Sequence, residues 1–343
     1  MKKILVCYGT RPELIKISPI LKNELVQYHS IFTLCTGQHS DLLGSDASSS
    51  WKFSILKPDH SLEINNCAPN RLNSIFSYLT GSYRFDQILE DGFTHVMVQG
   101  DTASALACAL AAFNKGLGVI HLEAGLRTHD KKHPYPEEAY RQAISRLTDV
   151  HLCATDANKT NLDNENVKGE IHVVGNTVLD NLTGTEISYN NDILITLHRR
   201  ENHELIPFWY QQIEDVALNN PDLNFVFVSH PNPNSQCALQ KQLSNVSIIP
   251  PVAHKEFIKR IGSCRFLITD SGGLQEEASF LKKKAIVCRE TTERPEALGT
   301  FTSLCKSVGE LPELFNKVKE DFIPEGDCPF GDGKSAEKIL QIL

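Results

Sequence analysis

Short apolar runs recur along the chain and alternate with segments of helical spacing. Each run is too short for a buried helix and several are rich in Val and Ile, which predicts buried parallel strands. The predicted strands of the first half are 4–8, 31–35, 94–98, 118–122, 150–154 and 171–174. Those of the second half are 192–197, 224–228, 246–249, 266–269 and 284–288. Strands that alternate with helices predict an α/β fold built on parallel sheets.

The two series of strands predict two Rossmann-like domains. A chain of 343 residues exceeds one typical core. The polar stretch 183–191 separates the series and is the predicted linker, so we expect domains at 1–182 and 192–332. Residues 57–75 are rich in Pro and Asn and predict an irregular loop that ends in a helix. A short amphipathic helix is predicted at about 333–343.

Composition narrows the class of partner. The chain has 42 acidic and 34 basic side chains and a net charge of −8, which argues against nucleic acid or an anionic membrane as the main partner. No apolar run approaches the roughly 20 residues of a membrane span. Residues 1–6 run directly into a strand, so we expect no signal peptide. The ten Cys form no C-x-x-C pair and indicate a reduced, cytoplasmic protein, and the thirteen His form no recognised zinc pattern.

Two strand-end loops have the composition of phosphate sites. Ser271-Gly272-Gly273 joins a strand to a helix, where backbone N–H groups and the helix dipole favour a phosphate. An ordinary tight turn is the alternative. Arg11 and Lys16 follow the first strand and suggest diphosphate binding, although a solvated surface pair is equally compatible with the segment alone.

Carboxylates follow three further predicted elements. Asp101 and Glu123 lie just past strand ends, and Glu137 and Glu138 open a helix after a Pro-rich turn. Each has a simpler reading, as a helix cap or a favourable first-turn acid. In a doubly wound sheet, however, strand ends converge on the ligand crevice, where neighbouring carboxylates can serve as acid and base.

Taken in order, these loops resemble those of the non-hydrolysing UDP-N-acetylglucosamine 2-epimerases. The resemblance rests on motifs at 9–16, 99–102, 123–128, 136–138, 198–202, 269–277 and 291–296. It implies two facing Rossmann-like domains in the GT-B arrangement, with the ligand cleft between them, UDP mostly on the second domain and the last helix packed back on the first. It also implies a cytoplasmic homodimer that needs no metal or other cofactor.

The implied reaction eliminates UDP across C1–C2 to give 2-acetamidoglucal and re-adds it after a proton returns to the other face of C2. By motif position, the catalytic set is Asp101, Glu123, Glu137 and His198. The implied substrate contacts are Arg11, Lys16, Phe257, Ser271, Gly272, Gly273, Glu277 and Arg294. Among these contacts, the resemblance implies that Glu277 binds the ribose and that Phe257 stacks on uracil. Which carboxylate serves which face of C2 stays open.

Other activities share parts of this pattern. A GT-B glycosyltransferase shares the fold and UDP site but does not need the carboxylate set, and a UDP-sugar sensor does not need it either. Hydrolysing 2-epimerases share the chemistry but usually lack the first loop in its Gly-Thr-Arg-Pro-Glu-x-x-Lys form. Another UDP-2-acetamido sugar could replace UDP-N-acetylglucosamine as substrate, and the implied product serves bacterial surface polysaccharides.

Many bacterial members are activated by a second UDP-N-acetylglucosamine. The candidate effector residues here are Gln38, His39 and Glu138. The loop that often reads Gln-His-Arg-Gln reads Gln38-His39-Ser40-Asp41, so an anion stands where the family has a neutral amide. A carboxylate facing a diphosphate is repelled, which predicts weak or absent activation.

Overall fold

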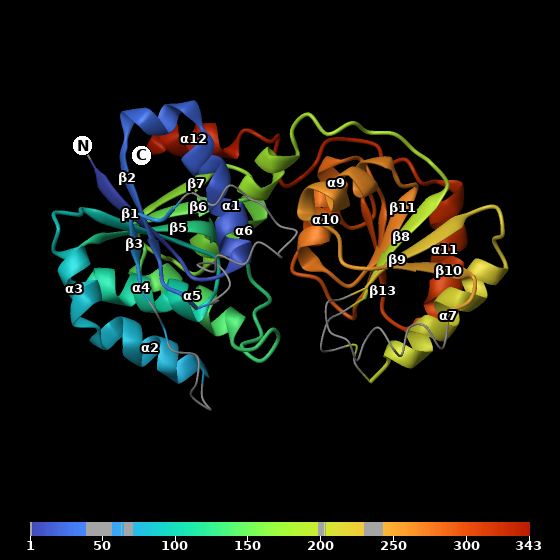
Figure 1. Ribbon diagram of the computed structural model, residues 1–343, viewed down its shortest axis with the longest axis horizontal. Helices are drawn as coiled ribbons and strands as arrows, with labels where there is room; N and C mark the ends of the chain where they lie inside the picture. The colour runs from blue at the N-terminus through green and yellow to red at the C-terminus, as the bar shows by residue number, and fades with distance from the viewer. Residues whose placement is uncertain are drawn as a thin grey trace. The chain divides into compact units, whose positions relative to one another are not determined.

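The computed structural model describes residues 2–38, 57–62, 64, 71–197, 202, 204–229 and 243–343, and every structural statement below concerns these residues. The chain divides into two compact units. Unit 1 comprises residues 1–181 and 331–343, and unit 2 comprises residues 182–330. Each unit is built on its own parallel sheet (Figure 1).

Unit 1 contains a seven-stranded sheet in the order β3-β2-β1-β4-β5-β6-β7. Every pairing in it is parallel. The strands are β1 Lys3–Tyr8, β2 Ser30–Cys35, β3 His60–Ser61, β4 His95–Gln99, β5 Gly118–Ala124, β6 Val150–Cys153 and β7 Glu170–Val173. The helices are α1 Arg11–Lys22, α2 Arg71–Gly81, α3 Tyr83–Leu89, α4 Ala103–Asn114, α5 Glu137–Leu147, α6 Asp156–Asn164 and α12 Ser335–Ile342, with 3-10 turns η1 Glu24–Tyr28 and η3 Thr177–Leu182.

Unit 2 contains a six-stranded parallel sheet in the order β10-β9-β8-β11-β12-β13. Its strands are β8 Asp192–Thr196, β9 Asn224–Val228, β10 Val246–Ile249, β11 Phe266–Thr269, β12 Ala285–Cys288 and β13 Thr302–Cys305. Its helices are α7 Ile206–Leu218, α9 His254–Ser263, α10 Gly272–Phe280 and α11 Leu311–Glu320, with 3-10 turns η5 Pro295–Ala297 and η6 Val308–Glu310.

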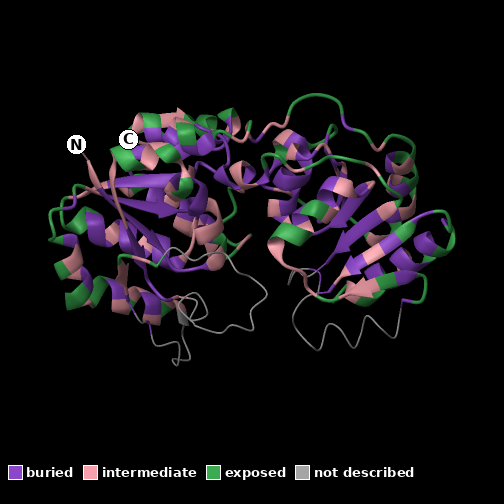
Figure 2. Ribbon diagram, turned by 45° about the horizontal axis from the view of Figure 1, so that its top comes forward, coloured by how far each residue is buried: buried purple, intermediate pink, exposed green. Residues whose placement is uncertain are grey.

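Both faces of the unit 1 sheet are buried under helices. Successive residues of β1 point to opposite faces, so Ile4 belongs to the core that contains α1 and α12, while Leu5 belongs to the core that contains α4. The central strands of both sheets are largely buried, whereas edge strands such as β7 and β10 and the outer sides of the helices are more exposed (Figure 2). The C-terminal helix α12 lies beside α1 (Figure 1) and buries Ile339 and Leu340 in the same core. It therefore supports the helix that carries Arg11 and Lys16.

The strand order places one switch point in each sheet. In unit 1 the order reverses between β1 and β4, and in unit 2 between β8 and β11. Loops at the carboxyl ends of the strands diverge there and leave a crevice, which is where ligands bind in open α/β sheets. The predicted phosphate and carboxylate loops follow β1, β4 and β5 in unit 1 and β11 in unit 2.

The α/β class with parallel sheets is confirmed, while two short strands escaped the sequence analysis. β3 lies within residues 57–75, where an irregular loop was predicted, and that prediction was wrong at His60–Ser61. These two residues pair with Leu34 and Cys35 of β2. The carboxylate of Asp59 also binds the backbone N–H of Thr33 at 2.8 Å. Both contacts are long-range, so no local pattern marks this strand.

Candidate functional site

A buried glutamate joins the two loops at the switch point of unit 1. The carboxylate of Glu13, which is 1% exposed, accepts hydrogen bonds from the backbone N–H groups of Gly9 at 2.9 Å and Thr10 at 2.6 Å. Its other oxygen accepts a bond from Oγ1 of Thr102 at 2.7 Å. Burial raises the pKa of Glu13, and these hydrogen bonds offset part of that rise. Glu13 therefore ties the loop after β1 to the loop after β4.

Glu123 stands at the end of β5 with both carboxylate oxygens bound. Its Oε1 lies 2.5 Å from Nζ of Lys16, and its Oε2 accepts a hydrogen bond from the side-chain amide of Gln99. The backbone φ of Glu123 is 67°, and the register of β5 against β6 shifts between Leu122 and Ala124. A positive φ is sparsely populated by residues other than glycine and is concentrated at functional sites.

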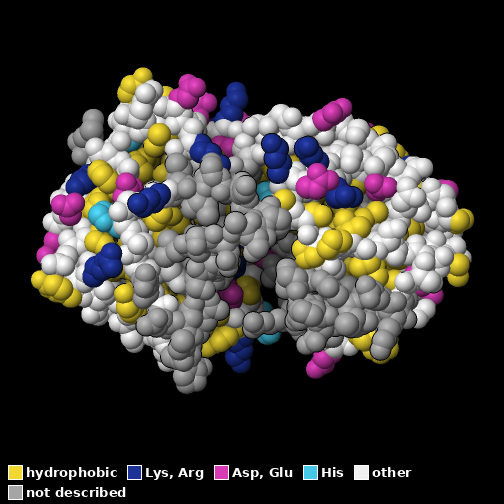
Figure 3. Space-filling model, viewed as in Figure 1, with side chains coloured by type: hydrophobic (Ala, Val, Ile, Leu, Met, Phe, Trp, Pro, Cys, Tyr) yellow, Lys and Arg dark blue, Asp and Glu magenta, His cyan; other side chains and the backbone are white. Residues whose placement is uncertain are grey.

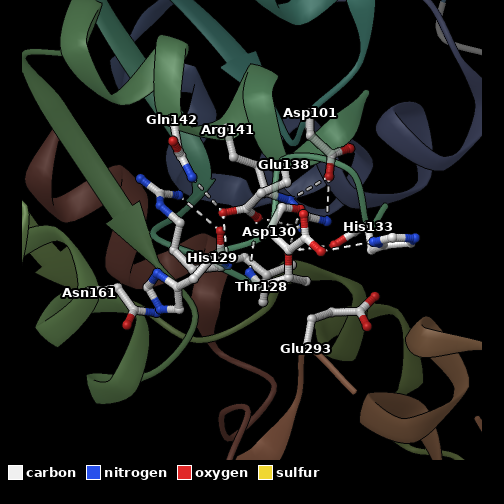
Figure 4. A network of polar contacts seen from close by, with 12 residues as sticks. Asp101, Thr128, His129, Asp130, His133, Glu138, Arg141, Gln142, Asn161 and Glu293 are labelled. Carbon is white, nitrogen blue, oxygen red and sulfur yellow. Dashed lines mark hydrogen bonds and ion pairs between the residues drawn. The ribbon is translucent and has the colours of Figure 1, made fainter. Parts of the chain in front are cut away.

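Asp101 is paired with an arginine of α5. Nε and Nη2 of Arg141 lie 2.7 Å and 2.6 Å from Oδ2 of Asp101, as Figure 4 shows. The side chains are 8% and 26% exposed, respectively. A charge-assisted contact of this kind fixes the position of the carboxylate. Asp101 does not cap α4, because the N-cap bond there comes from Thr102, whose side chain accepts from the N–H of Ala105.

Glu138 lies next to the pair of Asp101 and Arg141 and is hydrogen-bonded within the protein. Its side chain is fully buried and accepts hydrogen bonds from the backbone N–H groups of Thr128 at 3.0 Å and His129 at 3.2 Å (Figure 4). The side-chain amide of Gln142 donates a further bond at 2.9 Å. Glu138 thus fixes the loop that follows β5 against the start of α5.

Glu137, the first residue of α5, differs from its neighbour. The residue is half-buried, and its Oε2 is shielded from solvent without a hydrogen-bond partner among the residues described. Buried polar oxygens are usually hydrogen-bonded, so an unpartnered one marks a functional candidate. The three predicted acid/base carboxylates therefore have three different surroundings: a lysine and an amide, an arginine, and no partner for one oxygen.

A buried histidine shapes the loop between Gln99 and Asp101. Nε2 of His121 lies 2.8 Å from the carbonyl oxygen of Gly100. Burial lowers the pKa of His121 to about 3, so the ring is neutral and its Nε2–H donates this bond. Gly100 has a φ of 68°, a conformation that glycine adopts without strain.

The loop predicted to bind phosphate opens α10 in unit 2. A Cβ placed on Gly272 would lie 2.6 Å from Nη1 of Arg294, whereas one placed on Gly273 would meet no described atom within 4 Å. The backbone of Gly273 is therefore approachable, and the helix N-terminus favours an anion there. Below it, Oγ1 of Thr269 accepts the N–H of Ser271 at 3.0 Å, which braces the turn.

The cation predicted to contact the ligand in this unit is already paired. Nε of Arg294 lies 2.7 Å from Oε1 of Glu276, and its Nη1 lies 2.9 Å from Oε1 of Glu293. The second oxygen of Glu293 lies 2.8 Å from Nη1 of Arg289. All four side chains are buried, so they form a charge-balanced network beside the loop. Glu276 is thus held within this network by Arg294.

The predicted ribose and uracil contacts lie on neighbouring helices. Glu277 on α10 is 7% exposed, and its Oε1 lies 3.3 Å from Nε2 of His254, the first residue of α9. Phe257 lies one turn further along α9 and is half-buried. His254 thus occupies one oxygen of the carboxylate that the resemblance assigns to the ribose.

Several predicted residues lie outside the described part of the chain, namely His198, His39, Ser40 and Asp41. Gln38 is described, and its Oε1 accepts hydrogen bonds from the backbone N–H of Ser104 at 3.1 Å and from its Oγ at 2.7 Å. Arg11, the first residue of α1, is half-buried.

Three wider features bear on the class of site. Within the described ranges, no group of three or more His, Cys, Asp or Glu side chains is arranged to hold a metal ion. No described helix is both long and apolar enough to cross a membrane. Acidic and basic side chains are interspersed over the face shown in Figure 3.

The sequence analysis gave no role to Glu13, Gln99 or His121, which shape the site loops or position a carboxylate. Glu13 had a usable signal, because Thr10-Arg-Pro-Glu13 has the spacing of a capping box. Gln99 lies inside a recognised motif, but it is far from Glu123 in the sequence, so their contact was not predictable. His121 lies in an apolar run and carried no signal.

Two units, each with a parallel doubly wound sheet and polar loops at its switch point, define a Rossmann-like α/β protein with two such domains. Residues 24–343 match the family model described as UDP-N-acetylglucosamine 2-epimerase. The UDP-N-acetylglucosamine 2-epimerase of Campylobacter jejuni is 36% identical over an alignment 382 positions long, which covers 100% of this chain and 97% of that protein. The chain therefore belongs to the UDP-N-acetylglucosamine 2-epimerase family, which makes it an isomerase.

Solved structures agree with this assignment. The crystal structure of UDP-GlcNAc 2-epimerase from Neisseria meningitidis bound to UDP-GlcNAc matches with a TM-score of 0.85 and 33% identity, covering 100% of this chain and 99% of that one. MurG from Acinetobacter baumannii matches with a TM-score of 0.58 and 14% identity, covering 99% and 98%, and shows the fold alone. The predicted GT-B class is confirmed.

Proposed function

We propose that this chain converts UDP-N-acetylglucosamine to UDP-N-acetylmannosamine without net hydrolysis, by eliminating and re-adding UDP. Family membership over nearly the whole chain supports the substrate, and the N. meningitidis relative is described as bound to UDP-GlcNAc. The observation that carries the reaction type is the set of three carboxylates in unit 1 with three different sets of partners. Carboxylates held by different partners in one site can serve as both acid and base.

The reaction needs no oxidant or reductant. A base removes the proton from C2, the electron pair of that bond forms the C1–C2 double bond, and the C1–O bond breaks to release UDP. An acid then delivers a proton to the opposite face of C2, and a phosphate oxygen of UDP re-attacks C1. Carboxylates near C2 and donors on the departing diphosphate both lower the barrier.

We assign the proton transfers to Asp101, Glu123 and Glu137. Glu123 and Asp101 each have a cationic partner that holds the carboxylate in place, which suits a base. Glu137 has a shielded oxygen without a described partner, which leaves that oxygen available for proton transfer to the substrate. Arg11, Lys16 and His198 complete this assignment as partners of the diphosphate.

We assign nucleotide binding to unit 2. The open backbone at Gly273 and the start of α10 suit the diphosphate, together with Ser271 and Gly272. Glu277 is the proposed ribose ligand and Phe257 the proposed uracil contact. Arg294 contributes through the network that also holds Glu276 and Glu293.

Proton NMR of UDP-N-acetylglucosamine with the enzyme in D2O tests the proposal. We expect deuterium at C2 and the appearance of UDP-N-acetylmannosamine, with neither in an Asp101→Asn control. Free N-acetylmannosamine with UDP would indicate a hydrolysing enzyme instead. No change at C2 would refute the substrate, and a panel of other UDP-2-acetamido sugars would then decide whether the class of reaction holds.

The remaining expectations belong to the same proposal. The product would supply bacterial surface polysaccharides, and the enzyme would act as a cytoplasmic homodimer. Light scattering on a sizing column tests the dimer, since a single species of 38.3 kDa would exclude it.

A further inference from the structure

We propose that Gln99 is a positioning residue of the epimerisation site, where its side-chain amide and Lys16 together hold the carboxylate of Glu123 in one orientation. The inference rests on the proposed function and deepens it, because it adds a residue that acts through the proposed acid/base group. Gln99 does not need to touch the substrate for this role.

The strand register brings Gln99 and Glu123 together. Gln99 is the last residue of β4 and is 3% exposed, and it pairs with Leu122 of β5. Its amide donates to Oε2 of Glu123, while Nζ of Lys16 contacts Oε1 at 2.5 Å. The carboxylate is thus held at both oxygens, from β4 on one side and from α1 on the other.

The backbone makes this hold necessary. Glu123 has a φ of 67° at the register shift of β5, so the strand ladder does not fix its direction as it would in a regular strand. A carboxylate that transfers a proton must stay within a fraction of an ångström of its productive position. Two donors on two oxygens meet that requirement, whereas one would leave the group free to rotate.

The charge around Glu123 explains why a neutral amide suits the second position. Lys16 of α1 is a charged partner of Glu123, and burial keeps the nearby titratable ring of His121 on β5 neutral. Asp101 follows Gly100 on the loop after β4 and pairs with Arg141 of α5. A second cation on Glu123 would further favour the ionised form and weaken it as a base, whereas an amide orients it without adding charge.

Two variants separate this role from simple core packing. Gln99→Met keeps the length of the side chain and removes the donor. Gln99→Glu supplies a donor only while the introduced carboxyl group is protonated. Gln211→Met is the matched control, because it removes an exposed amide that donates to Asp215 at 3.0 Å in unit 2.

We expect kcat of Gln99→Met to fall about 10- to 100-fold while UDP affinity and the melting temperature stay near wild type. In Gln99→Glu, the residual activity should be highest at acidic pH and fall as the introduced group ionises. Gln211→Met should match wild type. Equal losses in both Gln99 variants at every pH, in step with a lower melting temperature, would reduce Gln99 to a packing residue.

Carbon-13 NMR of carboxyl-labelled glutamate gives a readout that does not need turnover. The signal of Glu123 is the one absent from Glu123→Gln. Because the lost amide favoured the ionised form, this signal should titrate at higher pH in Gln99→Met than in wild type. An unchanged titration overturns the inference. A wild type that leaves C2 of the substrate untouched refutes the proposed function instead, and the titration still judges Gln99.

Discussion

A single methyl group on Gly273 should strengthen the fold and weaken the nucleotide site. In the structure, a Cβ at this position meets no described atom within 4 Å, so Gly273→Ala introduces no clash. Gly273 is the second residue of α10, and alanine in place of glycine stabilises a helix by about 0.5–1 kcal/mol. We therefore expect an unchanged or higher melting temperature.

The same methyl group would occupy the space through which a phosphate oxygen approaches the backbone N–H. Loss of one hydrogen bond to a charged group costs about 1.5–3 kcal/mol, which corresponds to about 10- to 100-fold in the dissociation constant of UDP. Stability and affinity should thus change in opposite directions. A general loss of structure cannot produce that combination.

Gly272→Ala is the matched comparison. Its Cβ would lie 2.6 Å from Nη1 of Arg294 and 3.0 Å from Oε1 of Glu293, and both groups are held in ion pairs. This variant should lose stability as well as affinity. Thermal unfolding and titration calorimetry with UDP measure both quantities. A Gly273→Ala enzyme that binds UDP as tightly as wild type would refute a diphosphate site at the start of α10.

Four further predictions test other parts of the molecule. Loss of one acid/base group, in Asp101→Asn, Glu123→Gln or Glu137→Gln, should cut kcat about 100-fold or more and leave UDP affinity nearly unchanged. Near-normal rates in two of these three variants would reject the assignment. The raised pKa of Glu13 means that its carboxyl group binds a proton more tightly in the folded chain than in the unfolded chain. Wild type should therefore lose stability relative to Glu13→Gln as pH rises above about 4.5, which thermal scans at several pH values measure. Burial lowers the pKa of Lys283 from 10.5 to about 8. The stability of wild type relative to Lys283→Met should therefore increase as the pH rises from about 8 to 10.5, and parallel stability curves would contradict the shift. Initial rates from UDP-N-acetylmannosamine should not depend on trace UDP-N-acetylglucosamine, and a strict dependence would show that the effector site survives the changes at 40–41.

The class of fold was predictable because it depends on local patterns. Apolar runs and helical spacing are written into consecutive residues, and alternation of the two leaves few alternatives to parallel sheets. The unpredicted strands were β3 and β13, and β3 has only two residues. Such strands exist through their neighbours, since pairing with β2 is what orders His60 and Ser61. A single sequence does not contain that information in any one window.

The candidate site was also predictable only in part. Strand-end loops rich in Gly and charged residues were visible from the sequence, because switch points have a characteristic composition. The partners of those residues were not visible. Arg141 reaches Asp101 across 40 residues, and Gln99 reaches Glu123 across 24. The sequence also offered Asp101 as a cap of α4, but Thr102 takes that role.

Three cations of the two candidate sites are engaged in ion pairs within their own units, and this constrains how each can bind an anion. Lys16, Arg141 and Arg294 pair with carboxylates of their own units. Removing one partner of a buried pair, such as that of Arg294 and Glu276, costs about 3–5 kcal/mol unless a new anion replaces it. A diphosphate that recruits Lys16 would exchange one partner for another, so this contact would add little net affinity. The exchange has a chemical consequence, because Glu123 would lose its cation and become a stronger base once the leaving group is bound. Gln99 would then be the donor that still fixes its orientation, so the effect of Gln99→Met on kcat should exceed its effect on substrate binding.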